Sequence, residues 1–113
     1  MEDLTKVFKA LSDPNRIRIL KMLESRALCL CEISFILSVA NSTASQHLSI
    51  LKEAGLVIDD KDGKWVNYAL TAASASVYVN ELMPLIKKWL IDDKTIKADR
   101  KKIEAADRKI LCS

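Results

Sequence analysis

The apolar residues in the first part of the chain recur at helical spacing. A first helix is predicted over residues 2–11, where apolar side chains at i, i+3, i+4 and i+7 form one face: Leu4, Val7, Phe8 and Leu11. Asp13 and Pro14 then predict the start of a second helix that runs to about Ser25, because aspartate is a good N-cap and proline suits the first helical position. The chain therefore begins with two helices.

Two further helical segments are separated by a short turn. The segment that follows the second helix has apolar residues at helical spacing and ends at a turn over residues 38–41. The next helix is predicted from about Ser42 to Ala54, with Asn41 or Ser42 as its N-cap. One of its faces is apolar and the other is small and polar. Gly55 follows in the position that a left-handed C-cap requires.

The pattern then changes to two short apolar runs that predict a β-hairpin. The runs are residues 56–58 and 65–70, and Asp62-Gly63 between them is a strong hairpin signal. Helical spacing returns from about Ala75 to Ile91, and the charged residues 92–113 follow. This last segment is predicted to be a helix whose narrow apolar stripe needs a partner, because an isoleucine recurs every seven residues: Ile96, Ile103 and Ile110.

Helix, turn, helix and hairpin in this order predict a mainly α fold, a winged helix-turn-helix with a two-stranded β-hairpin wing. Small polar side chains let a helix approach base edges in the major groove. Gln46 suits an adenine edge, and Lys52 suits the phosphate backbone. The candidate DNA-binding residues are Ser42, Thr43, Ser45, Gln46, Ser49 and Lys52, with Lys61 and Lys64 in the wing. The same pattern also fits an ordinary solvated helix face.

Composition narrows the class of protein but does not add to the case for DNA binding. The 113 residues suffice for one domain with a modest core, and half of them are hydrophobic. Residues 1–91 carry 11 basic and 10 acidic groups, and residues 92–113 carry 7 and 5, for a net charge of +3. Such a near-neutral body does not by itself indicate a nucleic-acid binder. An acidic start and the lack of a long apolar stretch predict a cytoplasmic protein with no membrane partner.

Three cysteines are the candidate metal ligands: Cys29, Cys31 and Cys112. An odd number of them, two being one residue apart, does not indicate a disulfide framework, whereas thiolates do prefer soft ions. In a helix Cys29 and Cys31 point to nearly opposite sides, but in an extended segment they share one side, about 7 Å apart. One ion can therefore bind both only if the helix start is extended or unwound. The helix N-terminus is expected to lower the pKa of both thiols, and Glu32 to oppose this.

Three motifs resemble those of ArsR/SmtB-type metalloregulatory repressors. Residues 13–20 (DPNRIRIL) are similar to the second-helix signature of that family, residues 45–57 (SQHLSILKEAGLV) to its recognition helix, and residues 63–70 (GKWVNYAL) to its second wing strand. The resemblance extends over roughly residues 4–90. One departure concerns the wing, because residues 59–64 are net acidic where the family is usually basic.

The resemblance implies a homodimeric repressor that binds a palindromic double-stranded operator. The first and last core helices would pair across a two-fold axis, and a two-fold dimer matches a palindrome. Residues 1–91 would form the DNA-binding and dimerisation domain, and residues 92–113 a charged C-terminal helical tail.

Residues 28–33 (LCLCEI) are similar to the cysteine motif of the arsenite-sensing members of this family. This resemblance implies that As(III), Sb(III) or another soft metal ion binds Cys29 and Cys31 as inducer and releases the operator. It also implies that DNA binding itself requires no cofactor. Ser34 stands where the motif often has a third cysteine, so Cys112 is the remaining candidate for a third ligand.

Several alternatives stay open at this point. A redox switch would close a disulfide through Cys112, and the cysteines suit Cd, Pb or Cu(I) as well. A dimeric interaction module without a DNA role would use the tail helix. The zinc-sensing branch is excluded because residues 75–91 contain no histidine. An enzyme is not expected, since no acid–base pair stands out and His47, the one histidine, is expected to form a hydrogen bond within the domain.

Overall fold

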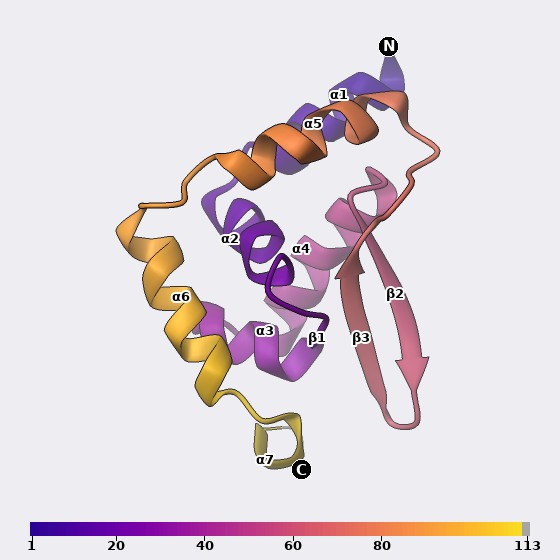
Figure 1. The fold of residues 1–113 in the computed structure, drawn as a ribbon. Helices are drawn as coiled ribbons and strands as arrows, with labels where there is room; N and C mark the ends of the chain where they lie inside the picture. Colours follow the sequence, from indigo (N-terminus) through magenta and orange to yellow (C-terminus); the bar gives the residue numbers. More distant parts are fainter. Residues whose placement is uncertain (112–113) are drawn as a thin grey trace.

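The computed structural model describes residues 1–111, and its elements follow the predicted order (Figure 1). The elements are α1 (Glu2–Leu11), α2 (Pro14–Leu23), β1 (Leu28–Cys29), α3 (Leu30–Leu37), α4 (Asn41–Glu53), β2 (Val57–Asp62), β3 (Trp65–Leu70), α5 (Val77–Lys88), α6 (Lys94–Ala105) and α7 (Arg108–Leu111). The predicted mainly α, winged helix-turn-helix fold is confirmed. The helix-turn-helix is α3 and α4, and the wing is β2 and β3.

The caps of the helices show where local sequence directs the chain. The side chain of Asp13 accepts hydrogen bonds from the backbone N–H groups of Asn15 and Arg16 at 2.8 and 3.2 Å, as an N-cap does. Gly55 follows α4 with a φ of +81°, a conformation that glycine adopts without strain. The predicted N-cap of α4 is wrong, because the helix begins after Ala40 with no side-chain cap.

The sheet has one strand more than the sequence predicted. β2 and β3 are antiparallel, with Asp62 opposite Trp65 across a tight turn. β1 pairs with the other edge of β3, so that the strand order is β1-β3-β2. A strand of two residues, Leu28 and Cys29, is too short to show an alternating pattern. This short strand matters for the cysteines, because the pairing of Cys29 with Asn67 attaches the first cysteine to the wing strand β3.

The C-terminal tail is two helices rather than one, and the apolar stripe of its main helix packs against the protein's own core. Ile96 and Ile103 of α6 are buried, whereas Ile110 in α7 is 75% exposed. Between the isoleucines, the buried carboxylate of Asp99 accepts two hydrogen bonds of 2.9 Å from the guanidinium of Arg18 in α2. That hydrogen bond raises the pKa of Arg18 above its usual value, against the opposing effect of burial. α6 is thus docked on α2 and α3.

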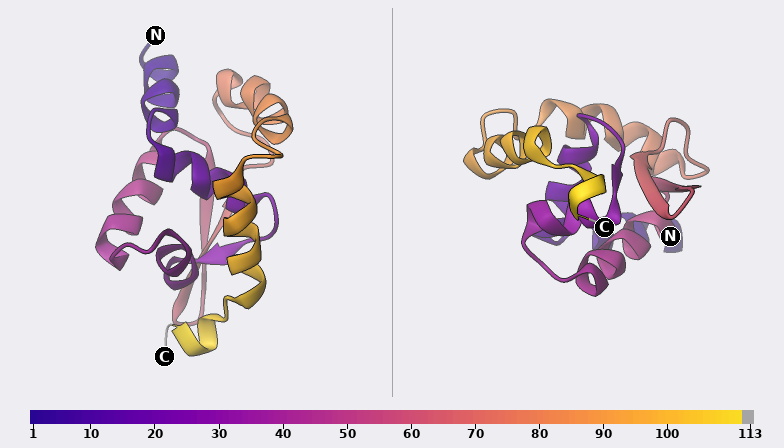
Figure 2. Two further views of the ribbon diagram at one scale, coloured as in Figure 1. Left: turned by 90° about the vertical axis from the view of Figure 1, so that its left-hand side faces the viewer. Right: turned by 90° about the horizontal axis from the view of Figure 1, so that it is seen from below.

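Three groups of elements surround one hydrophobic core: helices α1 and α5, the wing, and helix α6. α1 and α5 lie together at one end of the molecule, and α6 runs along the side opposite the wing (Figures 1 and 2). The core between them is formed by aliphatic side chains with no exposed surface, among them Ile19, Leu28, Ile33, Ile36 and Leu51. Within residues 1–111 no helix is long and apolar enough to cross a membrane.

Candidate nucleic-acid interface and thiol site

Helix α4 divides cleanly into a buried and an exposed face. Ala44, Leu48 and Leu51 are at most 1% exposed and fix the helix on the core. The opposite face is small and polar, as predicted. Of its candidate DNA-binding residues, Ser45 is half-buried and the others are exposed: Ser42, Thr43, Gln46, Ser49 and Lys52. The geometry required to enter a major groove, a helix with short polar side chains on its outer face, is therefore present.

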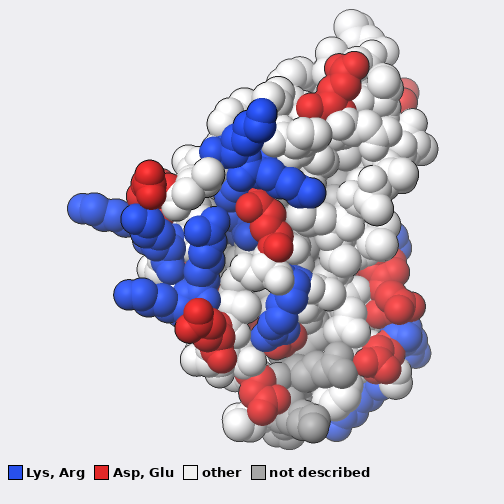
Figure 3. All heavy atoms as spheres, in the orientation of Figure 1, with Lys and Arg blue, Asp and Glu red and all other residues white. Residues whose placement is uncertain are grey.

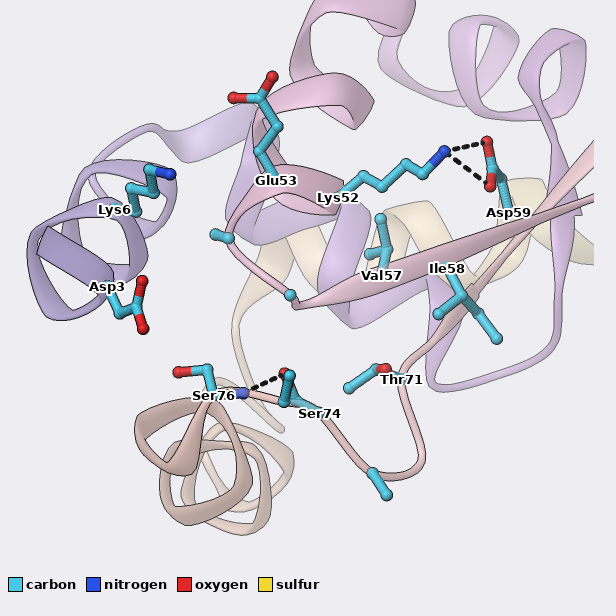
Figure 4. A pocket seen from close by; sticks show the side chains of 14 residues that line it. Asp3, Lys6, Lys52, Glu53, Val57, Ile58, Asp59, Thr71, Ser74 and Ser76 are labelled. Carbon is cyan, nitrogen blue, oxygen red and sulfur yellow. Dashed lines mark hydrogen bonds and ion pairs between the residues drawn. The ribbon is translucent and has the colours of Figure 1, made fainter.

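Lys52, at the end of α4, is not a free cation. Its ammonium lies 3.0 Å from the carboxylate of Asp59 at the start of the wing, and the two side chains face each other beside a pocket of about 520 Å³ (Figure 4). The Lys52 side chain is 53% exposed, so the pair is accessible to solvent and weak. A DNA phosphate would have to compete with Asp59 for this lysine.

The wing carries both positively and negatively charged side chains. Lys61 and Lys64 are exposed, and strand β2 also carries three exposed aspartates: Asp59, Asp60 and Asp62. The ammonium of Lys64 lies 5.1 Å from the centroid of the Trp65 ring, a cation–π distance. Residues 59–64 thus carry two cations and three anions, so any attraction of the wing for phosphates depends on Lys61 and Lys64.

Arg16 connects helix α1 to the recognition helix, a role that sequence reasoning missed. Its guanidinium donates to the backbone carbonyls of Ala10 and Lys9 at 2.9 and 3.1 Å and lies 3.2 Å from Nδ1 of the half-buried His47. The prediction that His47 forms a hydrogen bond within the domain is therefore confirmed. The signal in the sequence was the position of Arg16 in the DPNRIRIL motif, but spacing alone does not reveal a partner 31 residues away.

Cys29 is the N-cap of α3 and is only 1% exposed. Its backbone is extended, with φ −84° and ψ 166°, and its side chain accepts from the backbone N–H of Glu32. In return, the Glu32 carboxylate accepts from the Cys29 N–H at 2.9 Å, which completes a capping box. Cys31 is half-buried in the first turn of the helix. The backbone is thus extended at Cys29 and helical at Cys31.

The environment of Cys29 raises its pKa, and the prediction of a lowered pKa is wrong for this thiol. Burial is the main cause, since it disfavours the thiolate, and the negative charge of Glu32 acts in the same direction. For Glu32, burial raises the pKa, but hydrogen bonds from Arg26 and Cys29 outweigh burial and the net shift is downward. Cys29 is therefore a protonated thiol beside an ionised carboxylate at neutral pH.

Arg26 extends this cluster to the C-terminal helix. One guanidinium nitrogen lies 2.9 Å from the Glu32 carboxylate and donates to the backbone carbonyls of Ile103 and Ala106 at 3.3 and 3.4 Å. The end of α6 is thus linked to the N-cap of α3 through two side chains. Neither Arg26 nor Glu32 was singled out for this role by the sequence.

Ser34, which stands where the arsenite motif often has a third cysteine, is 8% exposed. Its hydroxyl donates to the backbone carbonyl of Cys31 at 3.1 Å and to the side-chain Oδ1 of Asn41, the first residue of α4, at 2.5 Å. Among the described residues, no three His, Cys, Asp or Glu side chains gather closely enough to hold a metal ion. The remaining candidate ligand, Cys112, lies outside the described residues.

Comparison with known sequences agrees with the fold. A family model described as "Bacterial regulatory protein, arsR family" matches residues 13–59. The arsenical resistance operon repressor of Escherichia coli (strain K12) is 32% identical over 108 residues, covering 93% of this chain and 82% of that protein. A cadmium resistance transcriptional regulatory protein CadC homolog of Staphylococcus aureus is 44% identical over 69 residues, covering 60% of this chain and 57% of that protein.

Solved structures share this fold. HlyU from Vibrio cholerae N16961 matches with a TM-score of 0.64 and 31% identity, over 77% of this chain and 90% of that one. The homodimeric winged helix-turn-helix DNA-binding domain Mb0332 from Mycobacterium bovis matches with a TM-score of 0.65 and 28% identity, over 77% of each chain. The fold and the relatives are those of DNA-binding regulators, not of enzymes. This chain belongs to the ArsR family of bacterial transcriptional regulators.

Proposed function

We propose that this protein is a homodimeric repressor that binds double-stranded operator DNA and releases it when a thiophilic ion binds Cys29 and Cys31. The observation that carries the proposal is the double role of Cys29, which is a soft ligand and also the N-cap of the helix that precedes the recognition helix. As(III) or Sb(III) is the inducer we favour, because arsenical repressors are among the relatives. Relatives named as cadmium regulators make Cd(II) the first alternative, before Pb(II) and Cu(I).

The proposed DNA contacts are the polar face of α4, assisted by the wing. Gln46 would read a base edge from the middle of that face, and Lys61 and Lys64 would reach phosphates from the wing tip. The shorter side chains would contact bases or phosphates: Ser42, Thr43, Ser45 and Ser49. Lys52 would contribute after leaving Asp59.

Self-association is supported by the apolar surface of α1 and α5. Phe8, Val77 and Leu85 are between 42% and 58% exposed, more than large apolar side chains prefer. Phe8 and Leu85 also line a pocket of about 240 Å³ between these helices. A second copy packed on this surface would place two recognition helices about a two-fold axis, and the operator would then be palindromic.

Ion binding would act on DNA affinity by opening the start of α3. The Cys29 thiol must lose its proton and leave the capping box before it can bind an ion, which removes a cap contributing about 1 kcal/mol. Helix α3 packs directly on α4, so a changed first turn alters the support of the recognition helix. The ion then favours a conformation with lower DNA affinity. Couplings of this kind are typically about 1–3 kcal/mol, or roughly 5- to 150-fold in affinity.

Cys112 is our candidate for a third ligand of a three-coordinate ion. Helix α7 packs against α3 and ends at Leu111, the residue before Cys112 in the sequence. The chain therefore returns toward the thiol site as it approaches its last cysteine.

The test is operator binding by the whole protein during titration with arsenite, Cd(II), Pb(II), Cu(I) and Zn(II), with thiolate absorbance as the measure of ion binding. Release is expected for the inducer, and Cys29→Ser and Cys31→Ser should each abolish it. Cys112→Ser serves as the matched comparison and should weaken the response if this thiol is a ligand. Undiminished operator binding with Cys29 and Cys31 both occupied would refute the proposal.

A thiol redox switch is the second candidate, and one observation favours it: Cys31 is disulfide-bonded in the structure. Oxidation would then change the same helix start without any ion. Operator affinity measured under reducing and mildly oxidising conditions, with the thiol state followed by mass spectrometry, separates the two candidates. Loss of binding under arsenite with all thiols still reduced would reject the redox switch.

A further inference from the structure

We propose that Ser34 is a positioning residue that couples the cysteine turn, residues 29–32, to the recognition helix. The inference rests on the proposed function, because it names the contact through which ion binding at the cysteine turn reaches α4. It assigns a role to the position where the chain departs from the arsenite motif of its family.

The geometry places one hydroxyl between the two functional elements. The Ser34 Oγ lies 3.1 Å from the carbonyl oxygen of Cys31 and 2.5 Å from the side chain of Asn41. Asn41 is the first residue of α4 and is followed directly by Ser42 and Thr43, two of the candidate DNA contacts. The main chain of Ser34 adds to this link, since its carbonyl accepts from the N–H of Val39 at 3.1 Å in the turn between the helices.

The two contacts of the hydroxyl are mutually compatible. Ser34 Oγ is the donor in both contacts, so its one proton is shared between Asn41 Oδ1 at 2.5 Å and the Cys31 carbonyl at 3.1 Å, and the shorter bond is the one to Asn41. Ser34 is 8% exposed, so water competes little for these bonds. A buried hydroxyl that is hydrogen-bonded to two groups holds the Cys31 carbonyl and the Asn41 side chain in a defined relative position.

Helical spacing explains why a change at the cysteines reaches this hydroxyl. Ser34 follows Cys31 by three residues, so both lie on the same face of α3. A neutral hydroxyl is a poor ligand for a soft ion, so Ser34 is not expected to join the ion's coordination sphere. Opening of the first turn would instead displace the Cys31 carbonyl, and the hydrogen bond to Ser34 would break. The Ser34 hydroxyl would then be held by Asn41 alone, so the position of Asn41 relative to the cysteine turn would no longer be fixed and the first turn of α4 would shift.

The experiment is a double-mutant cycle on Ser34 and Asn41 in the whole protein. Operator Kd is measured without ion and with saturating arsenite for the wild type, Ser34→Ala, Asn41→Ala and the double variant. The arsenite-induced increase in Kd should fall by about three- to tenfold in each single variant, the contribution of one hydrogen bond, and no further in the double variant. Ser34→Thr keeps the hydroxyl and should retain the wild-type response. The control Ser12→Ala removes an exposed serine that donates to Lys9, and should change nothing.

The possible outcomes distinguish a failure of the role assigned to Ser34 from a failure of the proposed function. Independent effects that multiply in the double variant, or a wild-type response in Ser34→Ala, would overturn it. Thermal denaturation separates coupling from stability, because a purely structural serine would lower Tm without changing the ratio of the two Kd values. If wild-type protein binds arsenite without releasing DNA, the proposed function fails. The cycle on operator Kd without ion then still decides whether Ser34 and Asn41 act together on the recognition helix.

Discussion

Helices α4 and α6 have nearly the same length, and both pack against α2 and α3. Their outer faces nevertheless differ in charge. On α4, of 13 residues, the outer side chains are short and polar, and its one lysine is paired with Asp59. On α6, of 12 residues, cations dominate the outer face, as the blue cluster in Figure 3 shows. These cations are Lys94, Lys97, Arg100, Lys101 and Lys102.

The comparison shows that the most positively charged helix surface and the surface shaped to fit a DNA groove lie on different helices. Positive charge attracts any polyanion, whereas base recognition needs hydrogen-bonding side chains on an element that fits a groove. A search for basic patches alone would have selected α6. The anchors differ as well, because α4 is held by aliphatic side chains while α6 is held by two isoleucines and the Asp99–Arg18 ion pair.

Asp99→Asn should detach α6 while leaving α4 in place. The substitution leaves Arg18 without its partner carboxylate, and we expect unfolding free energy to fall by about 2–3 kcal/mol, less than for a fully buried pair because Arg18 is 20% exposed. Hydrogen exchange should show faster amide exchange in α6 and unchanged protection in α4. The matched control is Asp92→Asn, which removes an exposed pair with Lys97 and should have no measurable effect. Equal loss of protection in both helices would contradict independent anchoring.

Gln46→Ala should weaken specific DNA binding without changing its electrostatics. Loss of a bidentate base contact is expected to raise operator Kd by about tenfold or more. The dependence of Kd on salt should stay the same, since no cation is removed. Quantitative operator titrations at several salt concentrations, with unrelated DNA as control, check both points. A proportional loss of affinity for unrelated DNA would show that Gln46 does not read a base.

Acidification should loosen the end of α6 before it affects α4. The folded-state pKa of Glu32 is below its usual value, so its contribution to stability is present at neutral pH and is lost as pH falls through that lowered pKa. Protonation would weaken the ion pair with Arg26, which also holds the carbonyls of Ile103 and Ala106. Hydrogen exchange near the end of α6 should therefore accelerate as the pH falls through the lowered pKa of Glu32, and Glu32→Gln should remove this pH dependence.

Lys97→Gln with Lys101→Gln should have the smallest effect, because α6 lies on the side of the molecule opposite the wing (Figure 1). We expect operator Kd and its salt dependence to stay within error of the wild type. The comparison variant Lys61→Gln with Lys64→Gln, in the wing, should lower the salt slope by up to about 2. A slope lowered by the α6 substitutions would instead mean that the charged helix contacts DNA.

Much of the fold could be predicted because its signals are local. Asp13 caps its own helix within three residues, Gly55 ends α4, and the spacing of Ala44, Leu48 and Leu51 defines the buried face of that helix. The polar face of α4 follows from the same periodicity. The cysteine pair was visible as a motif, but its chemistry was not, since the burial that raises the pKa of Cys29 comes from the packed core.

The relations between elements could not be predicted in this way. The two-residue strand β1 exists only because β3 offers it an edge, and the Arg18–Asp99 pair joins residues 81 positions apart. The sequence predicted that the isoleucine stripe of the tail would pack against a partner. The heptad pattern does not say whether that partner is another chain or, as in the structure, α2 and α3 of the same chain.

By itself, the sequence determined the main helices, the Asp13 cap, the hairpin and the polar face of α4, because each depends on residues a few positions apart. The tertiary structure alone decided that Cys29 is a buried cap bonded to Glu32, that Ser34 bridges the cysteine turn and Asn41, and that α6 docks on its own chain. These features depend on which distant groups packing brings within hydrogen-bond distance, and periodicity along a chain carries no information about that choice.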